Sequence, residues 1–358
     1  MDSLIIPIST GIVLILVAVL IELERRKRLS STEEAIEPEE IIDVESEPEI
    51  VKEEIFELPF EPVSDMTTQN ITINPKGDPT KVAILFGINV CDPFVYQGDT
   101  LRLQGCVNDS LHVRTYLMRQ KYGKIYLFTD KQATIGNFLK VWGEVSSTLK
   151  DGDTLLLQMS RHGMSLGENV LDTLGDTEIS KGEFSGDQAA VMHDGLIIDD
   201  CFWRLFSMLP KVKLIFLNDS CHSATQYKLA NLILPGKESK YIARRAVSNS
   251  YIPIKDKIVD LRQLEKLFPK PNTEVPKCTL VSLSGCQDHE FSADAYISRK
   301  YQGAFTFALL TAILAKPNST PRELSTSVKA ILAQRGFNQN PQVNIEGDQT
   351  FWDKPLLT

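Results

Sequence analysis

The sequence KVKLIFLNDSCHSA, residues 211–224, joins an apolar run to a cluster of small polar residues around one cysteine. The run lacks the polar alternation of a half-exposed strand, which indicates a strand buried in the centre of a parallel sheet. Cys221 therefore stands at the carboxyl end of a predicted strand, and open α/β sheets bind their ligands at that edge. A thiol there can be exposed while a rigid strand holds its backbone.

A second apolar run, TLLLQMS at residues 154–160, is followed directly by Arg161, His162 and Gly163. If the two runs form parallel strands, an imidazole can lie beside the thiol, as a cysteine nucleophile requires. The separation of 221 − 162 = 59 residues leaves room for one crossover connection. A lone cysteine or histidine at a strand end is more often structural, so the prediction depends on the pair. His222 would point away from the direction of Cys221 in an extended backbone, which favours His162 as the base.

Four motifs follow one another along the chain around this pair. They read R-L-Q-G-C-V-N-D at residues 102–109, S-R-H-G at 160–163, N-D-S-C-H-S-A at 218–224 and S-L-S-G-C-Q-D-H-E-F-S-A-D at 282–294. In this order they resemble the L-x-G-C-x-N-D, S-G-H-G, D-x-C-H-S-G and F-S-G-C-x-D-x-x-x-S-A-D motifs of the metacaspases, a family of caspase-like cysteine peptidases. Four ordered blocks are more specific than any one short pattern. The resemblance implies a caspase-like α/β/α sandwich around a mostly parallel sheet.

The resemblance also implies a cysteine endopeptidase that works through a dyad of Cys221 and His162. The thiolate of Cys221 would attack a peptide carbonyl, and His162 would form an ion pair with it and then protonate the leaving amine. The backbone amides of Gly163 and of Cys221 itself could stabilise the oxyanion. No third member of a triad is evident in the sequence.

For the substrate, the resemblance implies cleavage after Arg or Lys, with Asp109 and Asp219 at the positions of the family's substrate-binding aspartates. Two carboxylates at the end of a pocket can replace the hydration that a guanidinium loses on entry. An Asn-Asp turn is the structural alternative for Asp109. Cleavage after Asp would instead require a basic pocket. We expect a monomer that acts on proteins or peptides and has no nucleic-acid partner.

Calcium is implied as an activator, while the chemistry itself requires no cofactor. Asp199 and Asp200 match an acidic pair before a helix, and Asp172 or Asp176 could add oxygen ligands, of which Ca²⁺ takes about six to eight. A helix cap explains Asp199 equally well. The family's further aspartate after the nucleophile is missing, because residues 225–228 read TQYK.

Two positions depart from the family's motifs. Arg161 and Ala224 stand where metacaspases usually have glycine, which could narrow the room around the site. Arg161 also adds a cation near the thiolate, and a nearby cation favours the charged form. These departures leave a second hypothesis open, in which a catalytically impaired pseudoprotease holds peptides in the same cleft as a membrane-anchored binding module.

The N-terminal segment from Leu4 to Ile21 carries no charge, and the basic run RRKR follows at residues 25–28. As a helix, this segment would extend about 27 Å, close to the hydrocarbon thickness of a bilayer. The basic residues that precede the apolar part of a cleaved signal peptide are missing here. We therefore predict a single-pass membrane anchor over residues 1–28, with the catalytic domain on the cytoplasmic side. A buried core helix is the alternative.

Residues 29–78 form a predicted linker. Between residues 33 and 65 it holds fourteen acidic residues, one lysine and four prolines. Such a composition cannot bury enough apolar surface to offset the entropy of ordering, so we expect disorder. This segment accounts for the acidic character of the protein. The whole chain has a net charge of −9 and residues 33–65 have −13, so the rest of the chain has −9 − (−13) = +4. A solvated spacer is the simpler role, and a partner-binding or self-masking segment is the alternative.

Residues 79–358 form the predicted peptidase domain, in which strands alternate with helices as in a doubly wound parallel sheet. The cysteines contain no C-x-x-C pair and fit no zinc spacing. We expect strands at residues 81–88, 124–129, 154–160, 189–192, 212–217 and 279–284, and helices at 107–120, 135–149, 198–208, 303–314 and 321–334. Five cysteines are expected as structural thiols, namely Cys91, Cys106, Cys201, Cys278 and Cys286.

The segment from Tyr227 to Lys277 is too long for an ordinary connection, since loops above roughly 12 to 15 residues are uncommon in compact domains. It contains many Lys and Arg residues, and a tethered loop meets the cleft at a high effective concentration. We therefore predict autocleavage in this segment, after Lys240, Arg244 or Arg245. A helical insertion, with a helical turn at residues 241–247, is the structural alternative.

Overall fold

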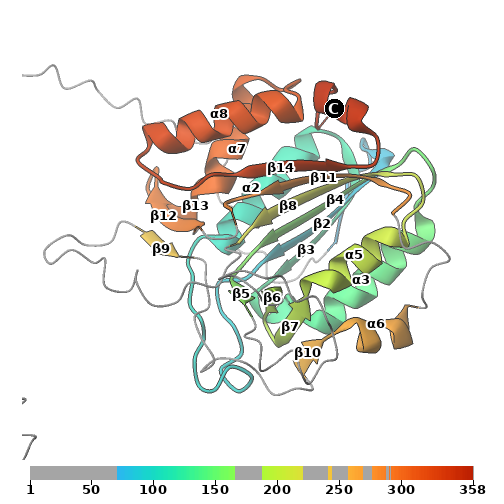
Figure 1. Cartoon of the computed structure of the whole chain (residues 1–358), viewed down its shortest axis with the longest axis vertical. Helices are drawn as coiled ribbons and strands as arrows, with labels where there is room; N and C mark the ends of the chain where they lie inside the picture. The colour runs from blue at the N-terminus through green and yellow to red at the C-terminus, as the bar shows by residue number, and fades with distance from the viewer. Residues whose placement is uncertain are drawn as a thin grey trace, which may run out of the picture. The chain divides into compact units, whose positions relative to one another are not determined.

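The computed structural model of the chain describes residues 71–165, 188–220, 241–243, 257–268, 276–287, 290 and 292–357. A seven-stranded sheet forms its centre, with helices on both faces (Figure 1). The five central strands are parallel, and an antiparallel strand closes each edge. This arrangement confirms the predicted caspase-like α/β/α sandwich. In sheet order the strands are β1 (Ile71–Ile73), β3 (Tyr122–Thr129), β2 (Asp78–Gly87), β4 (Thr154–Ser160), β8 (Lys213–Asp219), β11 (Thr279–Ser284) and β14 (Gln342–Glu346).

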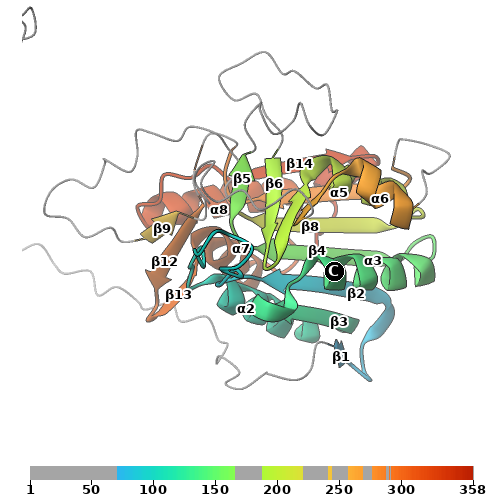
Figure 2. The same cartoon turned by 90° about the horizontal axis from the view of Figure 1, so that it is seen from below.

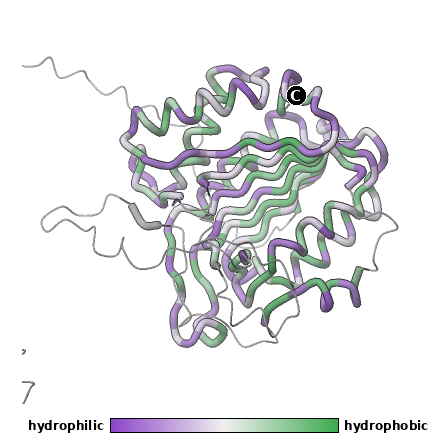
Figure 3. The backbone as a smooth tube through the Cα atoms, in the orientation of Figure 1, coloured by the Kyte–Doolittle hydropathy of each residue, from purple (hydrophilic) through white to green (hydrophobic). Residues whose placement is uncertain are grey.

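The central strands are covered on both faces, which explains their continuous apolar runs. Along β2, Ile84 and Phe86 pack into one core cluster, while Ala83 and Leu85 pack into the other. This division follows from the two-residue period of a strand, in which successive side chains point to opposite faces. Figure 3 shows the apolar residues concentrated in these strands.

Two layers of helices cover the sheet (Figure 1, Figure 2). On one face lie α2, α7 and α8, and on the other lie α3 and α5, with α6 beside α5. Aromatic side chains fill the second face, where rings of α5 contact both Phe216 of β8 and rings of α3. The helices are α2 (Cys106–Arg119), α3 (Ile135–Thr148), α5 (Asp199–Ser207), α6 (Leu261–Leu267), α7 (Ala304–Ala315) and α8 (Pro321–Gln334), with 3₁₀ turns η1 (Asp130–Gln132) and η3 (Gln349–Asp353).

Two smaller sheets extend from the carboxyl edge of the main sheet. One joins β5 (Gly163–Ser165), β6 (Gln188–Met192), β7 (Gly195–Ile198) and β10 (Ile258–Val259). The other joins β9 (Tyr241–Ala243), β12 (Ala293–Ile297) and β13 (Lys300–Gly303). Because β5 follows β4 almost directly and β13 leads into α7, both sheets border the edge at which the sequence predicts the site.

All the predicted strands and helices form, with ends shifted by at most three residues. The main sheet begins earlier than residue 79, because β1 and the first residue of β2 lie within the range assigned to the linker. The helical turn considered as an alternative at residues 241–247 does not begin at residue 241, since residues 241–243 form β9 and pair with β12, while residues 244–247 lie outside the described residues. The long segment before β11 also contains β10 and α6, so part of it has regular structure.

The predicted single-pass membrane localisation needs correction. Within the described ranges, no helix combines the length and the apolar character needed to cross a bilayer. The segment from Leu4 to Ile21 lies outside the described residues, as does everything else before residue 71. A membrane anchor and a cytoplasmic catalytic domain are therefore not supported.

Candidate active site

His162 lies just beyond the carboxyl end of β4, and its side chain is buried with 6% of its surface exposed. Its Nε2 atom is 3.0 Å from the backbone oxygen of Leu101. A carbonyl oxygen can only accept a hydrogen bond, so this contact requires a proton on Nε2. A neutral ring then presents its lone pair at Nδ1, the atom that can take a proton from a thiol.

Leu101 was not expected beside His162, because every residue has a backbone carbonyl and no sequence pattern marks this one. Its φ of 44° is in the left-handed region, which costs free energy for a leucine. The loop that contains it is held from both sides. Cys91 N donates to Thr100 O at 2.8 Å, and the hydroxyl of Tyr96 donates to a backbone oxygen of the β6–β7 turn. The surrounding structure thus maintains the strained conformation that directs the carbonyl at His162.

The strand β8 is the direct neighbour of β4, as the sequence predicts, and the two are parallel. Their register pairs Ser160 with Asp219, so His162 and Cys221 each lie two residues beyond this pair in the sequence. The backbone N–H of Arg161 donates to Asp219 O at 3.3 Å, which continues the contact beyond the strands. Ser220 is described and buried, and Cys221 itself lies outside the described residues.

Asp109 and Asp219 both bind the beginning of α7. Asp109, on α2, is fully buried, and its Oδ1 accepts a hydrogen bond from Gly303 N at 2.9 Å. Asp219 accepts from Thr306 N at 3.1 Å and from Thr306 Oγ1 at 2.6 Å, and its other oxygen accepts from Ser292 Oγ at 2.5 Å. The tertiary structure therefore brings the two predicted substrate-binding residues to one helix N-terminus, where the helix dipole favours negative charge.

A third buried carboxylate, Asp294 of β12, joins this region and was not assigned from the sequence. Its Oδ2 accepts a hydrogen bond from Gln104 N at 2.7 Å. A Cβ atom added to Gly105 would contact Asp294 Oδ1 and lie 2.5 Å from Gln302 Cα, so only glycine fits there. The motifs at residues 102–109 and 282–294 therefore contact each other. The place of Asp294 in the second motif is the signal that could have identified it.

The other predicted site residues are placed as follows. Gly163 begins β5 and pairs with Ala190 of β6. Asp199 and Asp200 occupy the first turn of α5. No group of three or more His, Cys, Asp or Glu side chains suited to a metal ion is found within the described ranges. Asp172, Asp176, Ala224, Lys240, Arg244 and Arg245 lie outside the described residues.

The five cysteines expected as structural thiols are all buried. Burial raises the pKa of Cys91, and the carboxylates of Asp130, Asp99 and Asp92 act in the same direction. Burial also raises the pKa of Cys278, to about 11. Both thiols therefore stay protonated at neutral pH and are poor nucleophiles.

Comparisons with known proteins agree with this architecture. The family model described as the caspase domain, of the peptidase family C14, matches residues 80–350. Metacaspase-1 of Ajellomyces capsulatus is 27% identical over 295 residues, covering 73% of this chain and 78% of that protein. Metacaspase-1 of Pyricularia oryzae is 25% identical over 299 residues, covering 73% and 70%.

Among solved structures, protein GSU0716 of Geobacter sulfurreducens is similar with a TM-score of 0.60 and 21% sequence identity. The similarity covers 78% of this chain and 99% of that chain, and it supports the fold alone. The family model spans both β4, which leads to His162, and β8, which leads to Cys221. On that match, the chain belongs to the caspase-domain family of cysteine peptidases.

Proposed function

We propose that this protein is a cysteine endopeptidase that cleaves after Arg or Lys through Cys221 and His162. The observation that carries the proposal is the hydrogen bond between His162 Nε2 and Leu101 O, which leaves Nδ1 as the basic atom of a neutral ring. This imidazole follows β4, the parallel neighbour of the strand that leads into Cys221.

In the proposed reaction, the thiol proton of Cys221 passes to His162 Nδ1, and the sulfur bonds to the peptide carbonyl carbon. Backbone amides of Gly163 and Cys221 donate to the oxyanion that forms. The C–N bond then breaks as His162 gives its proton to the leaving amine. Water next loses a proton to His162 and bonds to the acyl carbon, while the C–S bond breaks and Cys221 regains the proton.

The proposed preference for Arg or Lys rests on the buried carboxylates of Asp109 and Asp219. Both hold the N-terminal end of α7 through their hydrogen bonds to Gly303 and Thr306, so a structural role is established for each. A carboxylate can accept about four hydrogen bonds, so this role is compatible with binding a substrate cation. Asp294 is also buried and accepts a hydrogen bond from Gln104 N at the beginning of the same motif segment.

Hydrolysis of fluorogenic peptides with Arg, Lys or Asp before the reporter group tests the proposal on the full chain. We expect cleavage of the first two only. Cys221→Ala and His162→Ala should each lower kcat by more than about a thousandfold, because each removes a reacting group. Cys201→Ala is the matched control, since this buried thiol of α5 donates a hydrogen bond to the backbone oxygen of Val259 at 3.5 Å and takes no part in the proposed reaction.

Cleavage of the Asp peptide with an inert Arg peptide would contradict the specificity. Arg-peptide hydrolysis that persists in Cys221→Ala would contradict the role of Cys221 as the nucleophile.

The second candidate function, a peptide-binding pseudoprotease, is favoured by Arg161 and Ala224 at positions where the motif has glycine. It requires that the wild-type chain binds an Arg peptide with no turnover.

We also propose autocleavage after Lys240, Arg244 or Arg245, residues that flank β9 in the sequence. The connection between β8 and β11 carries these cations and is tethered to the domain that would cut them. Mass spectrometry of the purified chain should find an N-terminal fragment that keeps both His162 and Cys221. The Cys221→Ala variant should stay intact, and identical fragments from it would assign the cut to another protease.

Calcium activation and a monomeric state remain predictions. Ca²⁺ takes about six to eight oxygen ligands, and the adjacent carboxylates of Asp199 and Asp200 can supply only part of them. Activity that is unchanged by a strong chelator and by added calcium would contradict the calcium prediction.

A further inference from the structure

Arg161 has a buried guanidinium at the carboxyl edge of the main sheet. Only 2% of the residue is exposed, and within the described ranges no carboxylate forms a salt bridge with it. Burial lowers the pKa of Arg161 to about 9, against the opposing influence of Cys106 and Tyr96. The side chain therefore carries its positive charge at neutral pH.

The side chain of Arg161 joins the ends of the two strands that lead to the proposed catalytic pair. Its Nη1 donates to the backbone oxygen of His162 at 2.9 Å. Its Nη2 lies 3.5 Å from Asn218 Oδ1, a long hydrogen bond to the penultimate residue of β8. The same oxygen accepts from Ser220 Oγ at 2.9 Å, and Ser220 directly precedes Cys221. The guanidinium thus contacts the histidine directly and the residue before the cysteine through Asn218.

A buried cation without an anionic partner is costly, because removing a charge from water is repaid only by close opposite charge. Such an arrangement is expected where an anion forms during function. Among the described residues, the titratable groups around Arg161 are Tyr96 of the loop before α2, Cys106 of α2, His162 on its own segment and Asp219 of β8. Asp219 already accepts hydrogen bonds from Ser292 and Thr306, which turn its carboxylate toward α7.

We infer that Arg161 is a positioning residue of the proposed catalytic pair, which ties the ends of β4 and β8 together and supplies positive charge that favours the Cys221 thiolate. The inference rests on the proposed function and extends it to a residue that the chain has in place of the motif's glycine. Arg161 acts through His162, Asn218 and the local field, and it takes no part in bond making.

The test measures how fast iodoacetamide alkylates Cys221 as a function of pH, with the labelled peptide identified by mass spectrometry. Arg161→Met removes the charge and keeps much of the volume. We expect the pH midpoint of Cys221 alkylation to rise by about one pH unit in this variant, since a nearby opposite charge shifts the deprotonation of a group by about one to three pH units. Arg161→Lys keeps the charge and should leave the midpoint in place, while kcat for the Arg peptide falls because the two-armed contact is lost.

Arg114→Met is the matched control. Arg114 is a half-buried arginine of α2 whose Nε donates to Thr72 Oγ1 at 3.1 Å, and burial lowers its pKa as well. Its removal should leave the midpoint unchanged. Asn218→Leu separates the two parts of the inference, because it keeps the cation and removes the link to Ser220. We expect Asn218→Leu to lower kcat for the Arg peptide and to leave the pH midpoint of Cys221 alkylation at its wild-type value.

An unchanged midpoint in a folded Arg161→Met variant would overturn the charge contribution. If that variant does not fold, Arg161→Lys and Asn218→Leu decide, and wild-type kcat in both would overturn the positioning role. Alkylation needs no substrate, so the result is independent of peptidase activity. If the wild-type chain is inactive but its alkylation midpoint depends on Arg161, only the proposed function is contradicted. If the chain is active and its alkylation midpoint does not change in Arg161→Met, only this inference is contradicted.

Discussion

His162 and Arg161 are adjacent in the sequence, and the structure buries both for different reasons. The imidazole is held by a backbone oxygen 61 residues earlier, and the guanidinium bridges two strand ends. Each side chain contacts at least one uncharged group that is remote in sequence, Leu101 O for His162 and Asn218 Oδ1 for Arg161. Replacing either residue therefore removes contacts that lie at the carboxyl edge of the main sheet, next to the proposed catalytic pair.

His112 is a buried histidine of α2 whose titration should make the protein sensitive to acid. Burial, with a smaller contribution from Lys300, lowers the pKa of His112 to about 4. The unfolded chain takes up this proton near pH 6.5, so between about pH 6.5 and 4 the unfolded state binds more protons and stability falls as the pH falls. At pH 5.0 this single group should remove about 2 kcal/mol of the free energy of unfolding.

Urea unfolding at pH 7.5 and pH 5.0 checks this expectation, with His112→Gln as the variant that cannot titrate. The wild type should lose about 2 kcal/mol more than the variant between the two pH values. Equal losses in the two proteins would show that His112 accepts a proton in the folded state without penalty.

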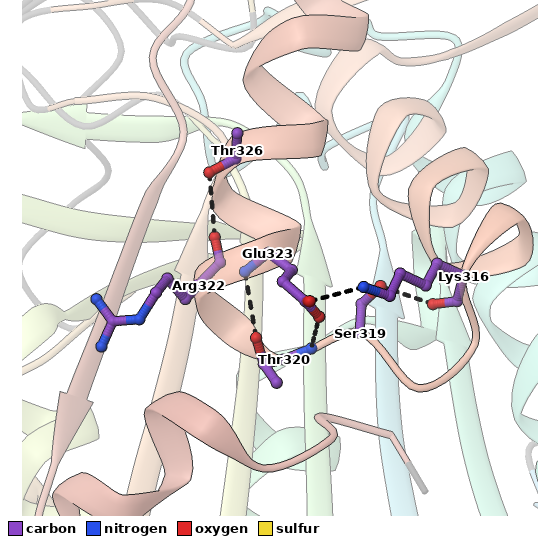
Figure 4. A network of polar contacts seen from close by, with 6 residues as sticks. All are labelled: Lys316, Ser319, Thr320, Arg322, Glu323 and Thr326. Atoms are coloured by element: carbon purple, nitrogen blue, oxygen red, sulfur yellow. Dashed lines mark hydrogen bonds and ion pairs between the residues drawn. The ribbon is translucent and has the colours of Figure 1, made fainter.

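Among the elements, α8 begins with a complete capping box, which Figure 4 shows. Thr320 Oγ1 accepts from Glu323 N at 3.3 Å, and the Glu323 carboxylate accepts from Thr320 N at 3.0 Å and from Lys316 Nζ at 2.6 Å. Pro321 takes the first helical position, where its missing N–H costs nothing. These contacts fix the angle at which α8 enters its packing against α7.

Removing the cap should destabilise the whole domain, because Leu324, Val328 and Leu332 of α8 belong to the core beside α7. We expect Thr320→Ala to lower the free energy of unfolding by about 1 kcal/mol. Thr326→Ala is the control from the same helix, since the exposed Thr326 hydroxyl donates to Arg322 O within the helix (Figure 4) and alanine is the better helix former. Urea midpoints that coincide for the two variants would contradict a role for the cap.

At the scale of the whole molecule, one register sets the geometry of the candidate site. The pairing of Ser160 with Asp219 brings the residues after β4 and β8 to equivalent positions at the carboxyl edge. Three further segments reach this edge from distant parts of the chain, namely the loop before α2, β12 and the beginning of α7. The two motif segments at residues 102–109 and 282–294 meet there because Gly105 lets Asp294 approach its backbone.

Much of this architecture could be predicted from the sequence. The continuous apolar runs of β2, β4 and β8 identify parallel strands buried on both faces, and strand ends with His162 and Cys221 identify the edge of the site. The helix α6 and the short strands of the sheet edges and of the two smaller sheets were not predicted, because segments of two to seven residues are too short to show a periodic signal. These strands are β1, β5, β7, β9, β10, β12, β13 and β14.

The sequence by itself determined the elements, their order and the residue types at the carboxyl edge, since periodicity and motifs are local properties. Only the tertiary structure decided that Leu101 O orients His162, that Arg161 is buried between two strand ends, and that Asp109 and Asp219 hold the start of α7. These contacts join groups 57 to 194 residues apart or use backbone atoms that every residue has. Long-range packing creates them, and no local pattern records it.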